Sequence, residues 1–353
     1  MRALVLSEHD LASWRALYDK GERPTALPYG VEALAEVGYQ LGSAEVPSGP
    51  FATRVRKAIE HRAGFPVART LAAVPKAAGA DLVVALLEGQ GRAAAWAKGH
   101  HLPPYARTPL LVWSCWLADD LSRMPADERR AYADTMRHAD LVTYLARAET
   151  EILLDAGFSA EQLFPMTYGV AADFYTPTGQ PKDIDVLAVG QDRGRDYATL
   201  FDAVRGTGIA VDVVCKPANL AGLDIPAEVT VHGPVPHVAY RALLRRAKVV
   251  AVPTVELTYP TGSSVTLEAS SCGACVVVSD TRSMREYVSD DESGLLVGVG
   301  DVDGWRAALT RSLNDDALRA RLGTGARASV TTRFNTRHMW HELARVLQER
   351  GIV

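Results

Sequence analysis

The residues best suited to chemistry lie in one turn and in the segment that follows it. The apolar run at residues 249–253 leads to Thr261, Gly262, Ser263 and Ser264, and a helix-period segment continues from there. Glycine lets backbone amides approach a ligand closely, and helix N-termini attract anions. Thr261 to Ser264 are therefore candidate ligands for a phosphate group. The alternative is an ordinary helix whose N-terminus is capped by a serine side chain.

Glu268 lies one turn into this helix, among small and apolar residues such as Val265, Leu267 and Ala269. A carboxylate in such surroundings needs a partner, because burying an unpaired charge is costly. A ribose diol offers two hydroxyl donors, so Glu268 is a candidate ligand for the ribose of a nucleotide. A structural ion pair is the alternative interpretation.

A second glycine-flanked turn carries two arginines. Gly190 follows the apolar run at residues 186–189, and Arg193 and Arg195 come directly after it in the stretch Gly-Gln-Asp-Arg-Gly-Arg. Guanidinium groups can stabilise the negative charge that develops on a leaving diphosphate without a metal ion. Gly190, Arg193 and Arg195 are therefore predicted to form the other half of the same site, with the arginines as catalytic groups. A solvated turn is the alternative.

Parallel sheets with intervening helices must position these residues, because short apolar runs alternate with helix-period segments along most of the chain. Strands are predicted at residues 2–6, 82–87, 110–113, 141–144, 163–166, 186–189, 211–215, 229–231, 249–252 and 276–278. Helices are predicted at residues 31–37, 92–98, 127–137, 149–156, 197–204, 238–246, 264–272, 305–313 and 336–350. Residues 171–183 have the composition of a linker. The pattern predicts an α/β protein with two Rossmann-like domains and a cleft between them.

The bulk composition narrows the class of protein. The chain of 353 residues suits two domains, and 48% apolar with 23% charged residues is typical of a globular protein. The net charge of −4 argues against nucleic-acid binding. Neither a membrane span nor a signal peptide is indicated.

Four cysteines are too few for a disulfide framework. Cys272 and Cys275 have C-x-x-C spacing, but they are expected to pack in the core. We therefore expect a reduced, cytoplasmic protein.

These motifs resemble those of the GT-B glycosyltransferases, and within them the retaining family 4, over roughly residues 169–334. Residues 168–174, Tyr-Gly-Val-Ala-Ala-Asp-Phe, resemble the family's N-G-V-D-x-x-x-F signature, and Gly190 with Arg195 resembles its G-x-x-x-x-K-G turn. His232 lies in a stretch similar to the H/F-x-G-x-V segment near the nucleotide base. Residues 267–277, Leu-Glu-Ala-Ser-Ser-Cys-Gly-Ala-Cys-Val-Val, resemble L-E-A-M-A-C-G-x-P-V-V, which is the most specific stretch.

The resemblance implies a GT-B fold with three parts. These are an acceptor-binding domain at residues 1–168, a nucleotide-sugar-binding domain at residues 169–335, and a C-terminal helix at residues 336–353 that can return to the first domain. In the family, the glutamate matching Glu268 holds the ribose, and the preceding loop binds phosphate and sugar. The implied reaction is retaining transfer of a sugar from a UDP- or GDP-sugar to a hydroxyl acceptor, which is a saccharide, a glycolipid or a small metabolite. No cofactor, metal ion or nucleic acid is expected to take part.

Three places depart from the family pattern. Pro260 stands where an earlier glutamate contacts the donor sugar, and Glu256 is the nearest acid upstream. Tyr29 and Gly30 replace a glycine-rich loop and are candidates for the acceptor side. The family's N-domain histidine would fall within residues 114–116, where the sequence is Ser-Cys-Trp. The nucleotide is therefore better specified than the sugar.

Several further side chains are candidates outside these motifs. His9 follows the first predicted strand and could face the cleft as an acid–base group. Asp119 follows the strand at residues 110–113, although a helix-start cluster is the alternative. Asp183 and Asp185 have D-x-D spacing, but they precede a strand and are expected to be strand-entry charges rather than metal ligands.

The stretch from residue 51 to residue 71 is locally basic. Arg54, Arg56, Lys57, Arg62 and Arg69 are interspersed with apolar residues. A solvated helix face is the first interpretation, and the pattern leaves peripheral contact with an anionic membrane open.

The sequence thus predicts a glycosyltransferase, with two alternatives. One is a sugar-nucleotide epimerase of the same fold, for which no acid–base carboxylates are assigned. The other is a catalytically silent nucleotide-binding partner subunit, because the donor-side glutamate and the N-domain histidine are missing.

Overall fold

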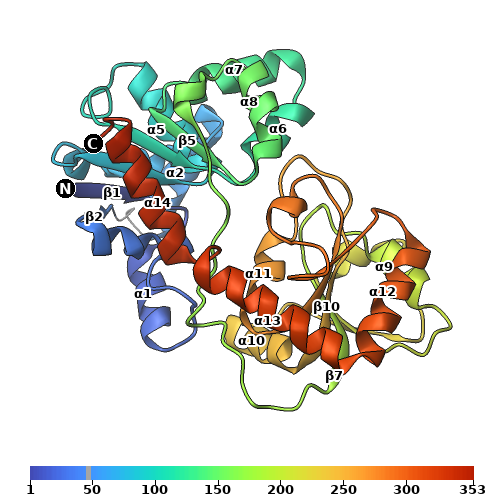
Figure 1. Ribbon diagram of the computed structural model, residues 1–353. Coiled ribbons are helices and arrows are strands. Elements are labelled where there is room, and N and C mark those ends of the chain that lie inside the picture. The colour runs from blue at the N-terminus through green and yellow to red at the C-terminus, as the bar shows by residue number, and fades with distance from the viewer. Residues whose placement is uncertain (45–48) are drawn as a thin grey trace. The chain divides into compact units, whose positions relative to one another are not determined.

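The computed structural model describes residues 1–44 and 49–353, and their contacts divide into two compact units (Figure 1). The first unit comprises Met1–Ala16, Ala26–Met166 and Trp340–Val353. The second comprises Leu17–Thr25 and Thr167–Met339. Within the described ranges, no helix combines the length and apolar character needed to cross a membrane.

A parallel sheet with the strand order β2-β1-β3-β4-β5-β6 forms the centre of the first unit. Its strands are β1 (Arg2–Leu6), β2 (Gln40–Ser43), β3 (Leu82–Leu86), β4 (Leu110–Trp113), β5 (Leu141–Tyr144) and β6 (Leu163–Pro165). Helices of this part of the chain are α1 (Leu11–Asp19), η1 (Pro28–Val37), α2 (Pro50–Ala63), α3 (Ala68–Ala72), α4 (Val74–Ala77), α5 (Glu88–Gly99), α6 (Leu117–Arg123), α7 (Ala126–Met136), η2 (Arg147–Glu149), α8 (Thr150–Asp155) and η3 (Ala160–Gln162). The central strands β3, β4 and β5 are buried on both faces, as is typical of parallel sheets, whereas the edge strand β2 is partly exposed.

Helix α14 (Thr336–Glu349) supplies the cover for part of this sheet. From Trp340 onward its residues group with the first unit. Trp340 lies with its ring centroid 6.2 Å from that of Trp113 at the end of β4, and its Nε1 donates to the carbonyl of Tyr29 at 2.8 Å. The expected return of the C-terminal helix to the first part of the fold is therefore present.

A second parallel sheet, in the order β12-β11-β10-β7-β8-β9, forms the centre of the second unit. Its strands are β7 (Ile184–Val189), β8 (Val211–Val214), β9 (Val229–His232), β10 (Ala247–Val252), β11 (Cys275–Ser279) and β12 (Leu295–Val297). The helices are α9 (Tyr197–Val204), η4 (Pro217–Leu220), α10 (His237–Arg246), α11 (Ser263–Ser271), η5 (Met284–Glu286), α12 (Val302–Asn314) and α13 (Asp316–Thr332).

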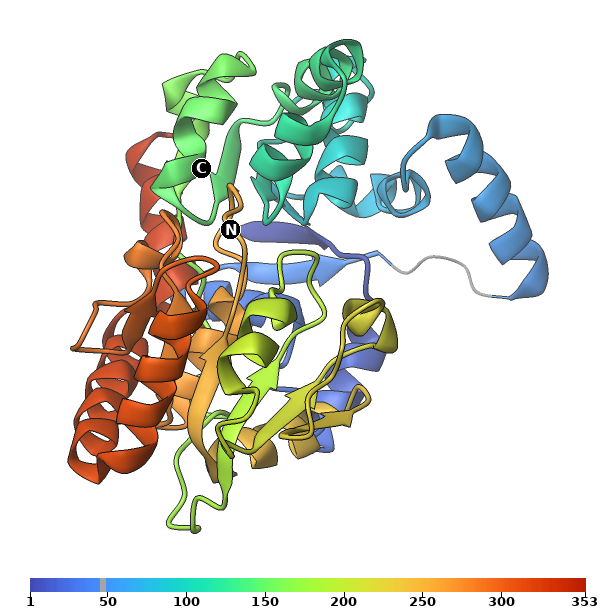
Figure 2. The same cartoon turned by 90° about the vertical axis from the view of Figure 1, so that its right-hand side faces the viewer.

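Alternation along the central strand β10 shows how this second sheet is covered. Val250 and Val252 belong to a core cluster with Leu267 of α11, whereas Val249 and Ala251 belong to another cluster that includes residues of α9 and α12. Figure 2 shows helices on both sides of these strands. Both units are therefore doubly wound α/β layers, which confirms the predicted fold class.

The structure also corrects the sequence predictions in places. Every predicted strand is present within two residues of its expected bounds, but the strands β2 and β12 and several helices, among them α1, α6 and α13, were not predicted. The helix expected at residues 31–37 belongs to the 3-10 helix η1, in which Tyr29 and Gly30 have φ angles of 59° and 71°. The segment at residues 171–183 lies within the second unit, and Tyr175 is buried in its core because its ring packs against Phe174 and Tyr240.

Candidate functional site

The loops after β7 and β10 meet where the strand order of the second sheet reverses. β7 lies between β8 and β10, so the chain leaves these neighbouring strands in opposite directions. Ligands of doubly wound sheets bind at such a switch point, at the carboxyl ends of the strands. Gly190 follows β7, and the turn that contains Gly262 follows β10. The two predicted halves of the phosphate site therefore lie at one edge of one sheet.

Backbone hydrogen bonds join these two loops. Arg195 and Thr254 form an antiparallel bridge. The Val255 N–H donates to the Gly194 carbonyl at 2.9 Å, and the Asp196 N–H donates to the Pro253 carbonyl at 3.0 Å. The arginine-bearing loop is thus fixed to the segment that leads into α11.

The Arg195 guanidinium lies between two glycines. A Cβ atom at Gly190 would stand 1.9 Å from Arg195 Nε, and a Cβ at Gly262 would stand 2.8 Å from Arg195 Nη1. Gly262 also has a φ of 88°, which side chains disfavour. Arg195 Nε and Nη1 are both buried, and among the residues that the structure describes they have no hydrogen-bond partner. Because buried charged donors are costly when unpaired, these N–H groups are suited to an anionic ligand.

Helix α11 begins beside this guanidinium. Gly262 is its N-cap, and no side chain caps it, so the serine-capped interpretation is wrong. The Ser263 N–H turns back to the Pro260 carbonyl at 3.1 Å. The Thr261 hydroxyl, predicted as a phosphate ligand, donates instead to Asp192 Oδ2 at 2.8 Å. The uncapped amides of the first turn and the Arg195 donors together form a positively polarised corner.

Glu268 projects from the same helix and is half-buried. The buried Tyr240 hydroxyl of α10 donates to Glu268 Oε2 at 2.7 Å. Burial raises the pKa of Glu268 to about 7, although the hydrogen bond from Tyr240 and the charge of Arg195 act in the opposite direction. Across the described part of the chain no cation lies within ion-pair distance of this carboxylate, so the structural ion-pair interpretation is wrong.

The remaining predicted donor residues lie around this corner or away from it. Arg193 is exposed, and its guanidinium stands 5.9 Å from the centroid of the Tyr259 ring. His232 ends the edge strand β9, and its Nε2 lies 2.5 Å from Oδ1 of Asp212 on β8. It therefore lies at the sheet edge rather than at the switch point. Glu256 accepts the Arg282 N–H at 3.2 Å and is exposed.

In the first unit the strand order reverses between β1 and β3, and His9 follows β1. Its Nε2 lies 3.5 Å from Glu8 Oε1, and its ring stands 4.9 Å from that of Trp14. The Tyr29 ring lies 4.6 Å from that of Trp113, and burial raises the pKa of its phenol. Gly30 is buried beside it in η1.

Asp119 lies in α6 and is only 2% exposed, with its Oδ2 2.8 Å from Arg123 Nε. Asp119 lies in the first turn of α6, and this ion pair within the helix gives its carboxylate a structural partner. Both observations agree with the interpretation of Asp119 as part of a helix-start cluster.

Glu88 is a buried carboxylate of the first unit that sequence reasoning missed. Its Oε1 accepts from Ser114 Oγ at 2.8 Å, from the Cys115 N–H at 2.6 Å and from the Trp116 N–H at 2.5 Å. Burial raises its pKa. Leu87, which precedes it, has a φ of 69°, a costly conformation for leucine. The signal available in the sequence was an acid directly after a buried strand.

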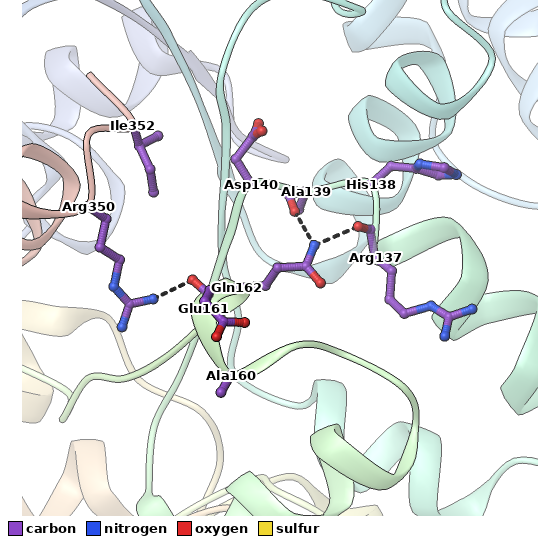
Figure 3. Close-up of a pocket in the computed structure, with 9 residues that line it drawn as sticks. All are labelled: Arg137, His138, Ala139, Asp140, Ala160, Glu161, Gln162, Arg350 and Ile352. Atoms are coloured by element: carbon purple, nitrogen blue, oxygen red, sulfur yellow. Dashed lines mark hydrogen bonds between the residues drawn. The ribbon is translucent and has the colours of Figure 1, made fainter.

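A cavity of about 880 Å³ lies at the amino-terminal ends of β5 and β6 in the first sheet (Figure 3). Its walls include residues that precede β5 and β6 together with Arg350 and Ile352 after α14. Gln162 Nε2 donates to the carbonyls of Arg137 and Ala139 at 2.7 and 2.8 Å, and Arg350 Nη1 donates to the Glu161 carbonyl at 2.6 Å. These bonds join three segments of the chain and give the cavity a structural role.

Two further expectations are confirmed. Asp183 directly precedes β7 and pairs with Arg246, as expected for a strand-entry charge, whereas Asp185 is the second residue of β7 and pairs with Lys248. Cys272 and Cys275 are free and buried, and they belong to different core clusters of the second unit, as a packing role predicts.

Comparison with known proteins gives a family for part of the second unit. Residues 218–329 match the family described as glycosyl transferases group 1. The D-inositol 3-phosphate glycosyltransferase of Xylanimonas cellulosilytica is 39% identical over 116 residues, which are 33% of this chain and 26% of that protein. The protein of the same name from Corynebacterium jeikeium is 29% identical over 255 residues, 62% of this chain and 59% of its own. The chain spans less than two thirds of the length of either relative.

Among solved structures, Anabaena HepE in complex with UDP and glucose has a TM-score of 0.71 and is 18% identical. The match covers 99% of this chain and 100% of that one. The likeness confirms the GT-B fold that the sequence predicted.

Proposed function

We propose that this chain, which carries a glycosyl transferases group 1 segment on a GT-B fold, transfers a sugar from a nucleoside diphosphate to a hydroxyl acceptor. The bond between the anomeric carbon and the diphosphate oxygen breaks, and the acceptor oxygen takes its place. Negative charge then develops on the departing diphosphate. The protein must stabilise that charge more strongly in the transition state than in the ground state.

The observation that carries this proposal is the position of Arg195. Its buried Nε and Nη1, which have no hydrogen-bond partner within the described residues, lie against Gly190 and Gly262, beside the uncapped start of α11. A diphosphate oxygen placed there would accept charge-assisted hydrogen bonds in a buried site, where the low dielectric constant strengthens them. Arg193 would add charge at the mouth of the site. Guanidinium groups and helix amides would thus take the part that a metal ion plays in other transferases.

Glu268 is proposed to hold the ribose. Tyr240 engages one oxygen of its carboxylate, which fixes the rotamer of Glu268 while the group accepts the ribose hydroxyls. UDP and UDP-glucose are bound by Anabaena HepE, which makes a uridine nucleotide the first donor to test here. Retention of anomeric configuration follows from the family resemblance and belongs to the same proposal.

The experiment that tests the proposal is calorimetric titration with UDP, GDP, ADP and dTDP, followed by product analysis with the corresponding sugar nucleotides. We expect one diphosphate to bind, and Glu268→Ala to weaken it. We also expect turnover to be unaffected by a chelator and slow with water as the acceptor. Absence of binding by all four nucleotides, or unchanged binding by the Glu268→Ala variant, would refute the proposal.

The two alternatives have different products. An epimerase would form a sugar-nucleotide isomer without an acceptor, and a silent subunit would bind nucleotide but turn over only with a second protein. The relatives reported above are named as transferases, which favours transfer.

The acceptor is assigned to the first unit, where His9 follows β1 at the reversal of strand order and Tyr29 lies in η1. His9 is half-exposed, and its ring contacts Glu8 and Trp14. It is therefore the group that we propose to accept the proton of the acceptor hydroxyl. Replacement by Gln should lower the rate of transfer and leave diphosphate affinity unchanged.

A membrane surface is a further proposed contact of the first unit. Figure 2 shows α2 standing off from the strands of that unit. Phe51 is 81% exposed on this helix, and Arg54 and Lys57 are exposed beside it. The neighbouring α3 borders an apolar hollow of about 230 Å³ that is lined in part by Val67 and Leu71. Basic and apolar groups on one helix favour anionic lipid.

A further inference from the structure

Asp192 connects the two loops that form the proposed diphosphate site. Its Oδ1 accepts from the Tyr259 hydroxyl at 2.5 Å and from the Gly194 N–H at 3.2 Å. Its Oδ2 accepts from the Thr261 hydroxyl at 2.8 Å. Asp192 and Gly194 belong to the loop after β7, whereas Tyr259 and Thr261 belong to the loop after β10. One carboxylate thus gathers donors from both loops.

The groups that Asp192 joins lie next to both parts of the proposed diphosphate site, so the position of Asp192 affects the geometry of that site. Tyr259 and Thr261 are 3% and 1% exposed, and they flank Pro260 immediately before the start of α11. Arg193 and Arg195 follow Asp192 on its own loop. A carboxylate only accepts hydrogen bonds, so both hydroxyl protons must point toward it. The bonds therefore fix the spacing between the arginine loop and the helix N-terminus.

We propose that Asp192 is a positioning residue that holds the Arg195 guanidinium at the distance from α11 that a diphosphate requires. The inference rests on the proposed function, because it assigns the diphosphate to this corner. Asp192 touches no substrate in this proposal and acts through Arg195, Tyr259 and Thr261. A small displacement of the Arg195 guanidinium relative to α11, the two parts of this diphosphate clamp, would have a large effect on binding and rate.

The sign of the effect separates positioning from simple charge. Asp192 is an anion on the same loop as the two arginines. If charge alone mattered, removing it would tighten the binding of another anion. If position matters, the same removal loosens the clamp and weakens binding. Tyr259→Phe provides a variant without any change of charge, because it deletes only the hydroxyl that donates to Asp192.

The test is calorimetric titration of the full chain with the nucleoside diphosphate that the wild type binds and with the matching monophosphate. We expect Asp192→Ala to raise the Kd of the diphosphate about ten-fold and Tyr259→Phe to raise it about three-fold, since each removes hydrogen bonds to a charged group. The Kd of the monophosphate, which lacks the terminal phosphate, should change by less than about three-fold. In an Arg195→Gln background, Asp192→Ala should change the diphosphate Kd by less than about two-fold, because coupled residues are non-additive.

Asp202→Asn is the matched control, because it removes an exposed negative charge from α9 of the same unit. It should leave both Kd values within about two-fold of the wild type. Tighter diphosphate binding by Asp192→Ala, equal weakening of both nucleotides, or additive effects with Arg195→Gln would overturn the inference. If Asp192→Ala does not fold, as judged by its melting temperature, unchanged diphosphate binding by Tyr259→Phe overturns it. If the wild type binds no diphosphate, the proposed function fails and the inference falls with it.

Discussion

Glu268 should make nucleotide binding depend on pH in a range where most carboxylates do not titrate. Burial raises its pKa to about 7, and the proposed ribose hydroxyls donate to the ionised form. A carboxyl with this pKa is about one-tenth ionised at pH 6 and about nine-tenths ionised at pH 8. Affinity should follow the ionised fraction. We therefore expect the Kd of the nucleoside diphosphate to fall about ten-fold between pH 6 and pH 8.

Calorimetry at pH 6, 7 and 8 on the wild type and on Glu268→Gln provides the assay. Glutamine keeps the shape and still accepts the Tyr240 hydroxyl, but it does not titrate. Its Kd at pH 8 should be about ten-fold higher than that of the wild type, in line with the loss of charged hydrogen bonds. The ionisation of the nucleotide's own phosphate is common to both proteins and cancels in the comparison. Parallel pH dependence in the two proteins would refute the assignment of Glu268.

The unliganded protein should show the opposite preference. A carboxyl whose folded pKa is raised above its ordinary value of 4.5 favours the folded state at low pH. That contribution is present below about pH 4.5 and is lost as the pH rises through about 7. Glu268→Gln should therefore raise the melting temperature at pH 8 by about 2–6 °C and have little effect at pH 5. A lower melting temperature of this variant at pH 8 would instead indicate a structural role for the charge.

Three further predictions concern other parts of the fold. Arg195→Gln should raise the Kd of the diphosphate by about 10–100-fold and lower the melting temperature little, because its buried Nε and Nη1 have no partner in the part of the chain that the structure describes; calorimetry and a thermal melt check both. Gly190→Ala should displace the guanidinium and weaken diphosphate binding at least as much, with a loss of about 1–3 kcal/mol of stability, measured by denaturant unfolding. Replacing Arg54 and Lys57 by Glu should reduce co-sedimentation with anionic vesicles several-fold and leave diphosphate binding unchanged; equal sedimentation of both proteins would remove the membrane proposal.

Much of the fold could be predicted because buried parallel strands are continuous apolar runs. β10 and β11 illustrate this, since valine fills both faces of each. Local signals were weaker elsewhere. β2 is a short edge strand that includes Gln40, Gly42 and Ser43. The helix α13 is continuous but contains Gly323 and Gly325, and glycine ordinarily disfavours helix. Gly323 is tolerated because α13 packs closely on the backbone at Gly273, a contact that only the fold reveals.

The candidate site was predictable where chemistry is local and was missed where it depends on tertiary contacts. Glycine, serine and glutamate at helical spacing indicated the turn before α11, and two arginines after a strand indicated its counterpart. The partners of these groups come from distant segments. Tyr240 reaches Glu268 across 28 positions, and Tyr259 reaches Asp192 across 67. No spacing rule connects such residues, because the pairing is set by the order of strands in the sheet.

The central claim is that the corner formed by Arg195, Gly190 and the start of α11 binds a diphosphate. A thermal-shift panel with UDP, GDP, ADP and dTDP, repeated on Arg195→Gln, tests it most directly. We predict that one nucleotide at about 100 times its Kd raises the melting temperature of the wild type by about 5–10 °C, because binding to the folded state stabilises by mass action. The same concentration should shift Arg195→Gln by about half as much or less. No shift with any of the four nucleotides, or equal shifts in both proteins, would contradict the claim.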